Sequence, residues 1–113
     1  MPDPLRGEVW NINLNPTKGR EQKGIRPALV VSDDRFNKSG AELAIIVPIT
    51  SKQKNIPYRV PVDPPEGGLD TRSYVMCDQI RTIDKIRFID KRGSISDDTL
   101  SAVEDRIRIL LSI

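Results

Sequence analysis

Two stretches, Arg26-Pro-Ala-Leu-Val-Val-Ser32 and Leu43-Ala-Ile-Ile-Val-Pro-Ile-Thr50, decide the fold of this chain. Both are short, continuously apolar and rich in β-branched residues, which is typical of strands that are buried on both faces. Pro48 has no backbone N–H, so we expect it at a bulge or an unpaired position of its strand. The pattern predicts two central strands, joined through residues 34–42.

Shorter runs of the same kind flank this pair and are separated by clusters of Gly, Pro, Asn and Asp. We predict further strands at residues 8–14, about 58–62, 73 to about 80, and 87–90. In the first of these, Trp10, Ile12 and Leu14 share one face, which we expect to be core. The cluster Pro64-Pro-Glu-Gly-Gly68 predicts a turn before the fifth strand.

Only the end of the chain has helical spacing. Ser96 can cap the first turn, and Asp97 and Asp98 follow it where the helix dipole favours carboxylates. An apolar stripe, which we expect to face the core, then recurs at three- and four-residue spacing: Leu100, Val103, Ile107, Leu110 and Leu111. The chain is therefore predicted to be mostly β, a small barrel with a C-terminal helix.

Composition indicates a single globular domain spanning residues 1–113, with 37 % apolar and 30 % charged residues. The longest apolar run, residues 43–49, is too short to cross a bilayer. The first residues contain no apolar segment after a basic start, and Cys77 is the only cysteine. We expect no secretory signal, no intrachain disulfide, no membrane association and a cytoplasmic location.

The chain contains no histidine. This excludes nucleophiles activated by histidine, two-histidine ribonucleases and the usual zinc sites. The pairs Asp33-Asp34 and Asp97-Asp98 are the remaining candidates for a hard cation, but consecutive side chains point apart, which favours turn and helix-start roles. We expect neither a metal nor another cofactor.

Basic residues are distributed unevenly, although the net charge is only +2. Residues 43–62 hold Lys52, Lys54 and Arg59 with no acid, and residues 80–92 hold five basic against two acidic side chains. Such a distribution can attract phosphates to one face. Charge alone is equally compatible with a mixed, solvated surface.

A hairpin-like connection between the two central strands would bring Arg26 and Thr50 together. Both residues are equidistant from Lys38, the midpoint of the connection, so an antiparallel pairing places them opposite each other. The basic loop at residues 15–24 runs into the same end of the sheet, where Ser51 also lies. A guanidinium and a hydroxyl in this arrangement suit a phosphodiester. The alternative is that Arg26 is a surface residue and that Thr50 merely ends a strand.

Four segments, in order, resemble the MazF/PemK toxins of type II toxin-antitoxin modules. They are Arg6-Gly-Glu-Val-Trp10, Gly19-Arg-Glu-Gln-Lys-Gly-Ile-Arg-Pro-Ala-Leu-Val-Val31, Pro48-Ile-Thr50 and Asp78-Gln-Ile-Arg-Thr-Ile-Asp84. The Glu-Gln-x-Gly-x-Arg-Pro and Asp-Gln-Ile-Arg-Thr-Ile-Asp segments are the specific parts. The resemblance covers nearly the whole chain.

The resemblance implies an SH3-like small barrel of five to seven strands and a homodimer with an RNA groove across its interface. It also implies a cognate antitoxin whose acidic tail lies in that groove. Similar proteins cut single-stranded RNA, such as messenger RNA, without a metal. They use the 2′-hydroxyl as nucleophile and leave a 2′,3′-cyclic phosphate and a 5′-hydroxyl. Such an endoribonuclease would be sequence-specific and would inhibit translation and growth.

Carried onto this sequence, the resemblance makes Arg26 and Thr50 the catalytic residues. Arg26 would bind the phosphate and handle the proton, while Thr50 would stabilise the oxyanion. The residues expected to bind or position RNA are Lys18, Arg20, Glu21, Gln22, Lys23, Ser51, Lys52, Gln79 and Arg81. Some relatives have a serine where this chain has Arg20, so that hydroxyl has no counterpart here. With few aromatic residues, recognition of bases is expected to depend on hydrogen bonds more than on stacking.

Two other classes of protein remain as alternatives. Toxins of the same fold that poison DNA gyrase resemble one another in a C-terminal Trp-Gly-Ile, whereas this chain ends Leu110-Leu-Ser-Ile113. An SH3-like module that binds peptides or methylated ligands would need an aromatic cage, and five aromatic residues can hardly supply one.

Overall fold

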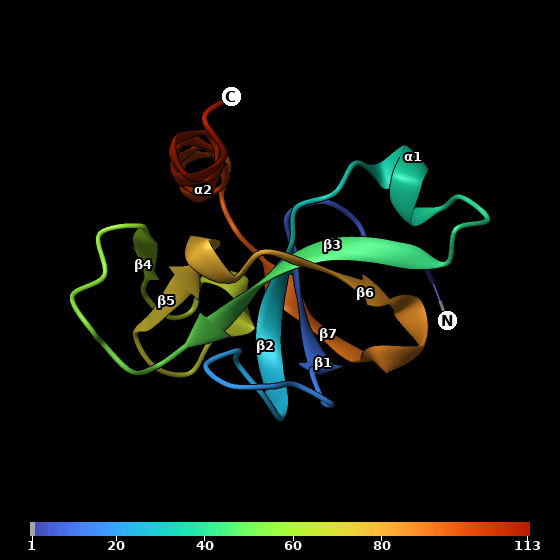
Figure 1. The fold of residues 1–113 in the computed structure, drawn as a ribbon, viewed down its shortest axis with the longest axis horizontal. Helices are drawn as coiled ribbons and strands as arrows, with labels where there is room; N and C mark the ends of the chain where they lie inside the picture. Colours follow the sequence, from blue (N-terminus) through green and yellow to red (C-terminus); the bar gives the residue numbers. More distant parts are fainter. Residues whose placement is uncertain (1) are drawn as a thin grey trace.

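The structure is a computed structural model that describes residues 2–113. Within these residues, seven strands are followed by one long helix (Figure 1). The strands are β1 Glu8–Asn13, β2 Ile25–Val30, β3 Leu43–Thr50, β4 Arg59–Val62, β5 Ser73–Met76, β6 Arg81–Asp84 and β7 Phe88–Ser94. The helices are α1 Asp34–Asn37 and α2 Asp97–Leu111, and short 3-10 turns lie at η1 Glu66–Gly68, η2 Cys77–Gln79 and η3 Lys85–Arg87.

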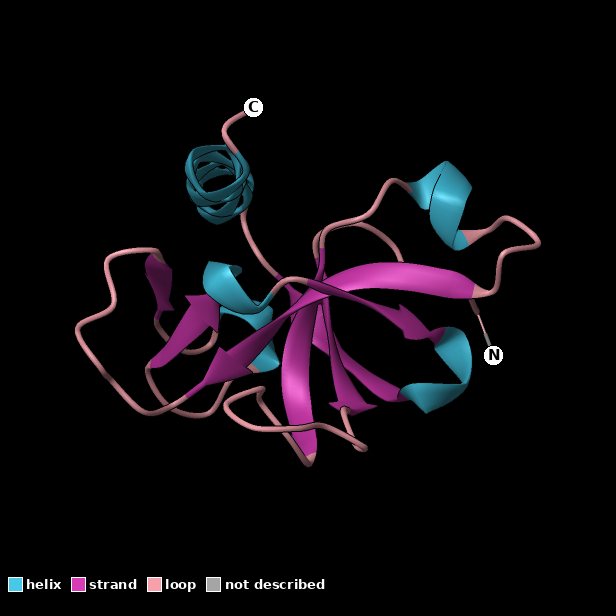
Figure 2. Cartoon of the chain, in the orientation of Figure 1, coloured by secondary structure: helices cyan, strands magenta, loops and turns pink. Residues whose placement is uncertain are grey.

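All strand pairings are antiparallel, in the order β4-β5-β3-β2-β1-β7, and β6 pairs with β3 (Figure 2). The strands curve around one another as in a small barrel. Within residues 2–113 the ring stays open between β6 and β7, which η3 connects without pairing. The predicted fold class, mostly β with a C-terminal helix in an SH3-like architecture, is confirmed.

The register of the two central strands matches the prediction. Ala28 pairs with Pro48, and Val30 pairs with Ile46, so the pairing is symmetric about Lys38. The recorded β2–β3 pairs end at Ala28 and Pro48, so Arg26 and Thr50 lie just beyond the paired part of this register, where Thr50 pairs with Tyr74 of β5 instead. The expectation that Pro48 is unpaired is wrong, because it has a register partner. It is tolerated at the end of this ladder, where β3 passes from β2 to β5.

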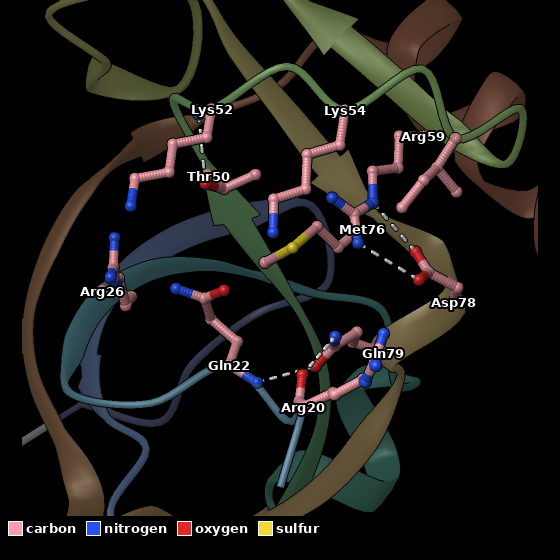
Figure 3. A pocket seen from close by; sticks show the side chains of 11 residues that line it. Arg20, Gln22, Arg26, Thr50, Lys52, Lys54, Arg59, Met76, Asp78 and Gln79 are labelled. Carbon is pink, nitrogen blue, oxygen red and sulfur yellow. Dashed lines mark hydrogen bonds and ion pairs between the residues drawn. The ribbon is translucent and has the colours of Figure 1, made fainter.

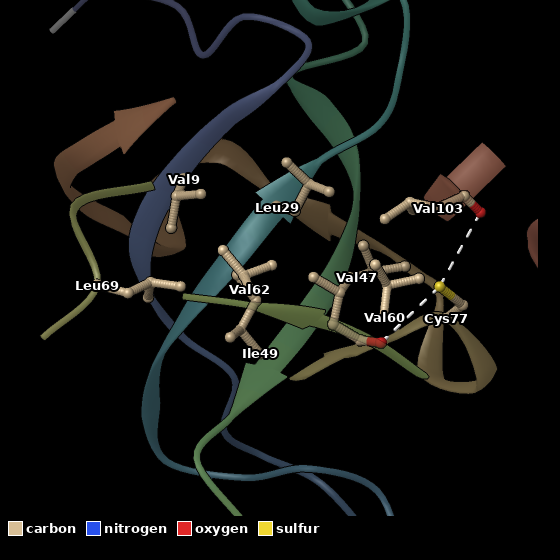
Figure 4. Close-up of a cluster of buried hydrophobic side chains, with 10 residues drawn as sticks. Val9, Leu29, Val47, Ile49, Val60, Val62, Leu69, Cys77 and Val103 are labelled. Carbon is tan, nitrogen blue, oxygen red and sulfur yellow. Dashed lines mark hydrogen bonds between the residues drawn. The ribbon is translucent and has the colours of Figure 1, made fainter. Parts of the chain in front are cut away.

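The central strands bury both faces, in two separate clusters. One cluster holds Val9, Leu29 and Val47 against β4, β5 and α2 (Figure 4). The other holds Trp10, Ile12, Leu14, Ala28, Val30, Ala44, Ile46, Ile83 and Phe88. The predicted core face of β1 is therefore confirmed, and its opposite face also contributes a core residue, Val9, because α2 and the β4–β5 hairpin cover that side.

The helical stripe faces the core only in its first half. Val103 is fully buried and Leu100 and Ile107 are half-buried, but Leu110 and Leu111 are 36 % and 52 % exposed. The prediction was wrong for these last two residues because the packing of α2 on the core cluster ends at Ile107. Figure 1 shows α2 end-on beside the sheet. Within residues 2–113, no helix has both the length and the apolar character needed to span a membrane.

Two strand predictions were also wrong. The expected strand at 73–80 ends at Met76, because η2 interrupts it, and β6 then forms a separate strand at Arg81–Asp84. β7 extends to Ser94, beyond the predicted end at residue 90. The missed break matters for function, since η2 turns Asp78 and Gln79 toward the end of β3.

The turn cluster and the paired aspartates have structural roles. Gly68 has φ +67°, and a Cβ there would lie 2.2 Å from the Arg92 carbonyl oxygen, so only glycine allows η1 to approach β7 this closely. The Asp33 side chain caps α1, and the Asp34 Oδ1 accepts from the Arg6 amide at 2.7 Å. The first pair of aspartates is thereby confirmed as turn and helix-start residues.

Candidate active site

A cavity of about 590 Å³ opens where β3 ends, between the 15–24 loop, η2 and the start of β4 (Figure 3). Cationic side chains dominate its lining. The lining residues are Arg20, Gln22, Arg26, Thr50, Lys52, Lys54, Ile56, Arg59, Met76, Asp78 and Gln79. Five of these are cations and only Asp78 is an acid, so the cavity is suited to anions such as phosphates.

Thr50 is held rigidly in the wall of this cavity. It is the last residue of β3, pairs with Tyr74 of β5 and is 5 % exposed. Its Oγ1 accepts a hydrogen bond from the Lys52 amide at 3.2 Å, as expected for a hydroxyl at a strand end. Because Thr50 Oγ1 is an acceptor in this contact, its hydroxyl hydrogen remains available to donate to a ligand.

Arg26, at the start of β2, is half-exposed, and its guanidinium is oriented by the 15–24 loop. Its Nε donates to the Lys23 carbonyl oxygen at 3.1 Å. With its amide turned so that the oxygen faces Arg26, Gln22 accepts from Nε at 2.8 Å and from Nη2 at 3.2 Å. These contacts fix one edge of the guanidinium, and the other edge can bind an anion.

Gln79 attaches the loop to the body of the protein. Its Oε1 accepts from the Gln22 amide at 2.8 Å, and its Nε2 donates to the Arg20 carbonyl oxygen at 3.1 Å (Figure 3). Both ends of the side-chain amide are therefore engaged with the loop backbone. In the structure Gln79 positions the loop, and its predicted role in positioning RNA stays a prediction.

A bidentate ion pair forms the far wall of the cavity. The Arg59 side chain is only 9 % exposed, and its Nε and Nη2 lie 3.2 and 3.3 Å from the two oxygens of Asp78. Neither residue was among the predicted site residues, and neither were Lys54, Ile56 and Met76. The acid-free run from residue 43 to 62, which contains Lys54 and Arg59, was the available signal for two of them.

The predicted RNA-binding residues are distributed over the cavity and its margins. Arg20, Gln22, Lys52 and Gln79 line it together with Arg26 and Thr50. Glu21 and Arg81 line an adjoining hollow that shares Arg20 and Gln79, and Ser51 lines another that shares Arg26. Lys18 and Lys23 are not among the lining residues of these hollows, although the Lys23 backbone orients Arg26.

Cys77 lies next to the site without belonging to it. Burial raises the pKa of its thiol to about 11, and the neighbouring Asp78 carboxylate adds to this effect. Its Sγ faces the carbonyl oxygens of Val75 and Val103 in the core (Figure 4). Such a thiol is not a nucleophile at neutral pH. Within residues 2–113, no group of three or more Cys, Asp or Glu side chains is placed to hold a metal ion.

The fold and this cavity define a class of protein, a small β-rich domain with a cationic cavity that is suited to phosphates. Residues 5–111 match the family model described as PemK-like, MazF-like toxin of type II toxin-antitoxin system. Endoribonuclease EndoA of Bacillus subtilis (strain 168) is 34 % identical over 110 residues, which cover 96 % of this chain and 94 % of that protein.

Solved structures agree with this match. The crystal structure of MazF (Form-I) from Deinococcus radiodurans has a TM-score of 0.90 at 29 % identity and covers both chains fully. An endoribonuclease in complex with its cognate antitoxin, from Mycobacterial species, has a TM-score of 0.79 at 26 % identity, with 100 % of this chain and 97 % of that chain covered. The chain belongs to the PemK-like, MazF-like toxin family, and the predicted enzyme class, endoribonuclease, is confirmed with it.

Proposed function

We propose that this chain is a sequence-specific, metal-independent endoribonuclease toxin that cuts single-stranded messenger RNA in the cytoplasm and thereby inhibits translation and growth. The observation that supports this most directly is the cavity in which Arg26 and Thr50 meet, lined by four further cations and one acid. Family membership supports the toxin and ribonuclease parts of the proposal. The cavity supports the phosphate-binding part.

In the proposed reaction, the 2′-oxygen beside the scissile phosphate attacks phosphorus and the bond to the 5′-oxygen breaks. The 2′-hydroxyl loses a proton and the 5′-oxygen gains one, which leaves a 2′,3′-cyclic phosphate and a 5′-hydroxyl. Arg26 binds the non-bridging oxygens, and the Thr50 hydroxyl donates to the same oxyanion as charge develops. No protein nucleophile is needed, because the substrate supplies it.

The family resemblance implies that Arg26 also handles the proton, but the chemistry of a guanidinium favours a different role. A guanidinium keeps its proton near neutral pH, so it is a poor general base. We therefore assign Arg26 the task of stabilising negative charge while solvent in the open cavity carries the proton. This assignment predicts that the charge of residue 26, more than its ability to lose a proton, determines the rate.

The experiment that tests the proposal maps cut sites and end groups on a defined long RNA in excess EDTA. We expect discrete cuts with cyclic-phosphate and 5′-hydroxyl ends. Replacing the 2′-hydroxyl at a mapped cut site by hydrogen should abolish that cut. Cleavage that persists in the deoxy-substituted RNA would mean that water or a side chain is the nucleophile, and cleavage that stops with EDTA would mean that a metal is required.

We further propose that the protein works as a homodimer and is inhibited by a cognate antitoxin. The apolar end of α2 supports the dimer, since Ile109, Leu111 and Ile113 are 53 %, 52 % and 81 % exposed. The cationic cavity supports an antitoxin with an acidic segment that excludes RNA by occupying the same groove. Sedimentation equilibrium of the purified chain tests the dimer. Growth arrest that is relieved by co-expressing the antitoxin tests the inhibition.

A further inference from the structure

A second groove, of about 200 Å³, adjoins the active-site cavity on its β4–β5 side and shares three lining residues with it: Lys54, Ile56 and Arg59. Its remaining wall includes Pro61, Arg72 and Tyr74. Because the two spaces adjoin at these shared side chains, a polymer bound at Arg26 and Thr50 has this groove directly beside it. No predicted site residue lies in it.

Strand register sets the groove beside the catalytic hydroxyl. Thr50 of β3 pairs with Tyr74 of β5, and Tyr74 pairs in turn with Pro61 of β4. Directly opposite residues in antiparallel strands project to the same face. The residues that alternate with them, such as Val75 and Val60, are buried in the core. Thr50, Tyr74 and Pro61 therefore form one row on the outer face of the sheet.

Tyr74 and Arg72 together present planar groups to the groove. The Arg72 guanidinium carbon lies 5.9 Å from the centre of the Tyr74 ring, which is within cation–π range. Arg72 is held there by Asp63, whose two carboxylate oxygens lie 2.9 and 3.0 Å from its Nη1. The Arg72 side chain remains 55 % exposed, so this pair is accessible from solvent.

Unpaired nucleic-acid bases bind to such surfaces. Bases that are splayed out of a single strand stack on aromatic rings and on guanidinium planes, while nearby cations contact the phosphates between them. In this groove the planar pair is Tyr74 and Arg72, the cation is Lys54, and Ile56 adds an apolar wall. A peptide or a lipid surface would not require two neighbouring planar groups beside a phosphate-binding cavity.

We propose that Tyr74 and Arg72 form a base-binding subsite that holds one unpaired nucleotide adjacent to the cleaved phosphodiester. This inference rests on the proposed function, the cleavage of single-stranded RNA at Arg26 and Thr50. The scarcity of aromatic residues predicted recognition by hydrogen bonds, but one tyrosine in register with the catalytic threonine is enough to stack one base. The subsite contributes to RNA affinity and to the choice of cut site.

The contribution of the subsite to RNA affinity can be measured without cleavage. The ligand is an RNA that has hydrogen in place of the 2′-hydroxyl at a mapped cut site. Loss of one stacked base costs about 1–3 kcal/mol, so Tyr74→Ala and Tyr74→Leu should raise Kd about tenfold. Tyr74→Leu separates stacking from apolar packing, since it keeps an apolar side chain but has no planar ring. Tyr74→Phe should bind within twofold of the wild type, as should the matched control Tyr58→Ala, whose side chain lines neither space. Thermal unfolding of each variant checks that it folds.

An abasic scan of the same RNA, used as a substrate with its 2′-hydroxyls intact, identifies the nucleotide. A single abasic site is moved along the positions flanking the cut, and kcat/KM is measured with the wild type and with Tyr74→Leu. We expect one position at which base removal lowers wild-type kcat/KM about tenfold and lowers that of Tyr74→Leu hardly at all. A penalty of equal size in both proteins, or wild-type binding by Tyr74→Leu, would overturn the subsite while RNA cleavage stands. A wild-type protein that cuts no RNA would instead overturn the proposed function and the subsite together.

Discussion

The two sides of the active-site cavity are built in opposite ways. On the strand side, Thr50 is 5 % exposed and fixed by pairing between β3 and β5, with a hydrophobic core behind it. On the loop side, Arg20 and Gln22 belong to the 15–24 loop, which is joined to the rest of the site by the side chain of Gln79. The Thr50 hydroxyl is thus positioned by the sheet, whereas the 15–24 loop positions Arg20 and the guanidinium of Arg26.

Arg26 connects the two sides. Its backbone belongs to β2, yet its guanidinium is held by the Lys23 carbonyl and the Gln22 amide. The comparison therefore indicates that the loop controls the orientation of the Arg26 guanidinium, the proposed catalytic charge, while β2 fixes the position of its backbone. Substitutions on the strand side and on the loop side should therefore reduce activity in different ways.

The largest effect is expected at Arg26. Arg26→Ala removes the phosphate-binding fork, and we expect kcat/KM for RNA to fall by about 10³-fold, as for loss of an oxyanion-stabilising group. Arg26→Lys keeps the charge but not the bidentate geometry, so it should recover part of this loss. The free energy of unfolding should change little in either variant, because the side chain is half-exposed. An Arg26→Ala protein that cuts RNA at the wild-type rate would remove Arg26 from the mechanism.

Thr50 tests the strand side. Thr50→Val keeps the shape and the β-branch that suits a strand but has no hydroxyl, and we expect kcat to fall by about 10²-fold with KM nearly unchanged. Thr50→Ser should retain most of the activity, because it keeps the donor. If the Ser and Val variants were equally slow, packing rather than the hydroxyl would explain the role of Thr50.

Gln79 tests the loop side. Gln79→Leu removes both hydrogen bonds to the loop, so the orientation of Arg26 should become less restricted and kcat/KM should fall about tenfold. Trypsin should then cut faster at Lys18, Arg20 or Lys23. Gln79→Glu keeps the acceptor for the Gln22 amide but loses the donor to the Arg20 carbonyl. Its kcat/KM should therefore lie between those of the wild type and Gln79→Leu. Unchanged proteolysis together with reduced RNA binding would instead assign Gln79 to direct contact with RNA.

The smallest effects are expected from the exposed cations, Arg20 on the loop side and Lys52 on the strand side. Replacing either with Ala removes one phosphate contact, so affinity should fall a few-fold at moderate salt. The slope of log Kd against log salt should decrease by about 0.7 in each case, the value for one contact on a single strand. A variant whose slope does not change would show that its cation does not contact RNA phosphate.

Sequence reasoning predicted the parts of the site that depend on strand pairing. The symmetric spacing of Arg26 and Thr50 about Lys38 was sufficient, because antiparallel register follows from the connection and needs no side-chain detail. It did not reveal the Arg59–Asp78 pair or the role of Gln79. Both depend on η2, where the backbone leaves the β conformation within an apparently strand-like segment, and local propensity gives little sign of such a break.

For the helix, too, the sequence predicted the element but not all of its contacts. Apolar spacing identified α2 and its cap at Ser96, whose Oγ accepts from the Thr99 amide at 3.2 Å. Spacing could not show how far along α2 the contacts with the core continue. Leu111 therefore looked like a core residue in the sequence, although Ile107 is the last residue of the stripe that packs on the core cluster.

The tip of the β2–β3 connection does not line the cavity that holds the proposed catalytic groups. Gly40 and Ala41 are exposed there, and a Cβ on Gly40 would meet nothing within 4 Å. This tip is a suitable place to insert a fluorophore-labelled peptide or an affinity handle, from which the toxin can be immobilised or followed while it remains active. The same tip is also free to differ in length between proteins that cut RNA in the same way.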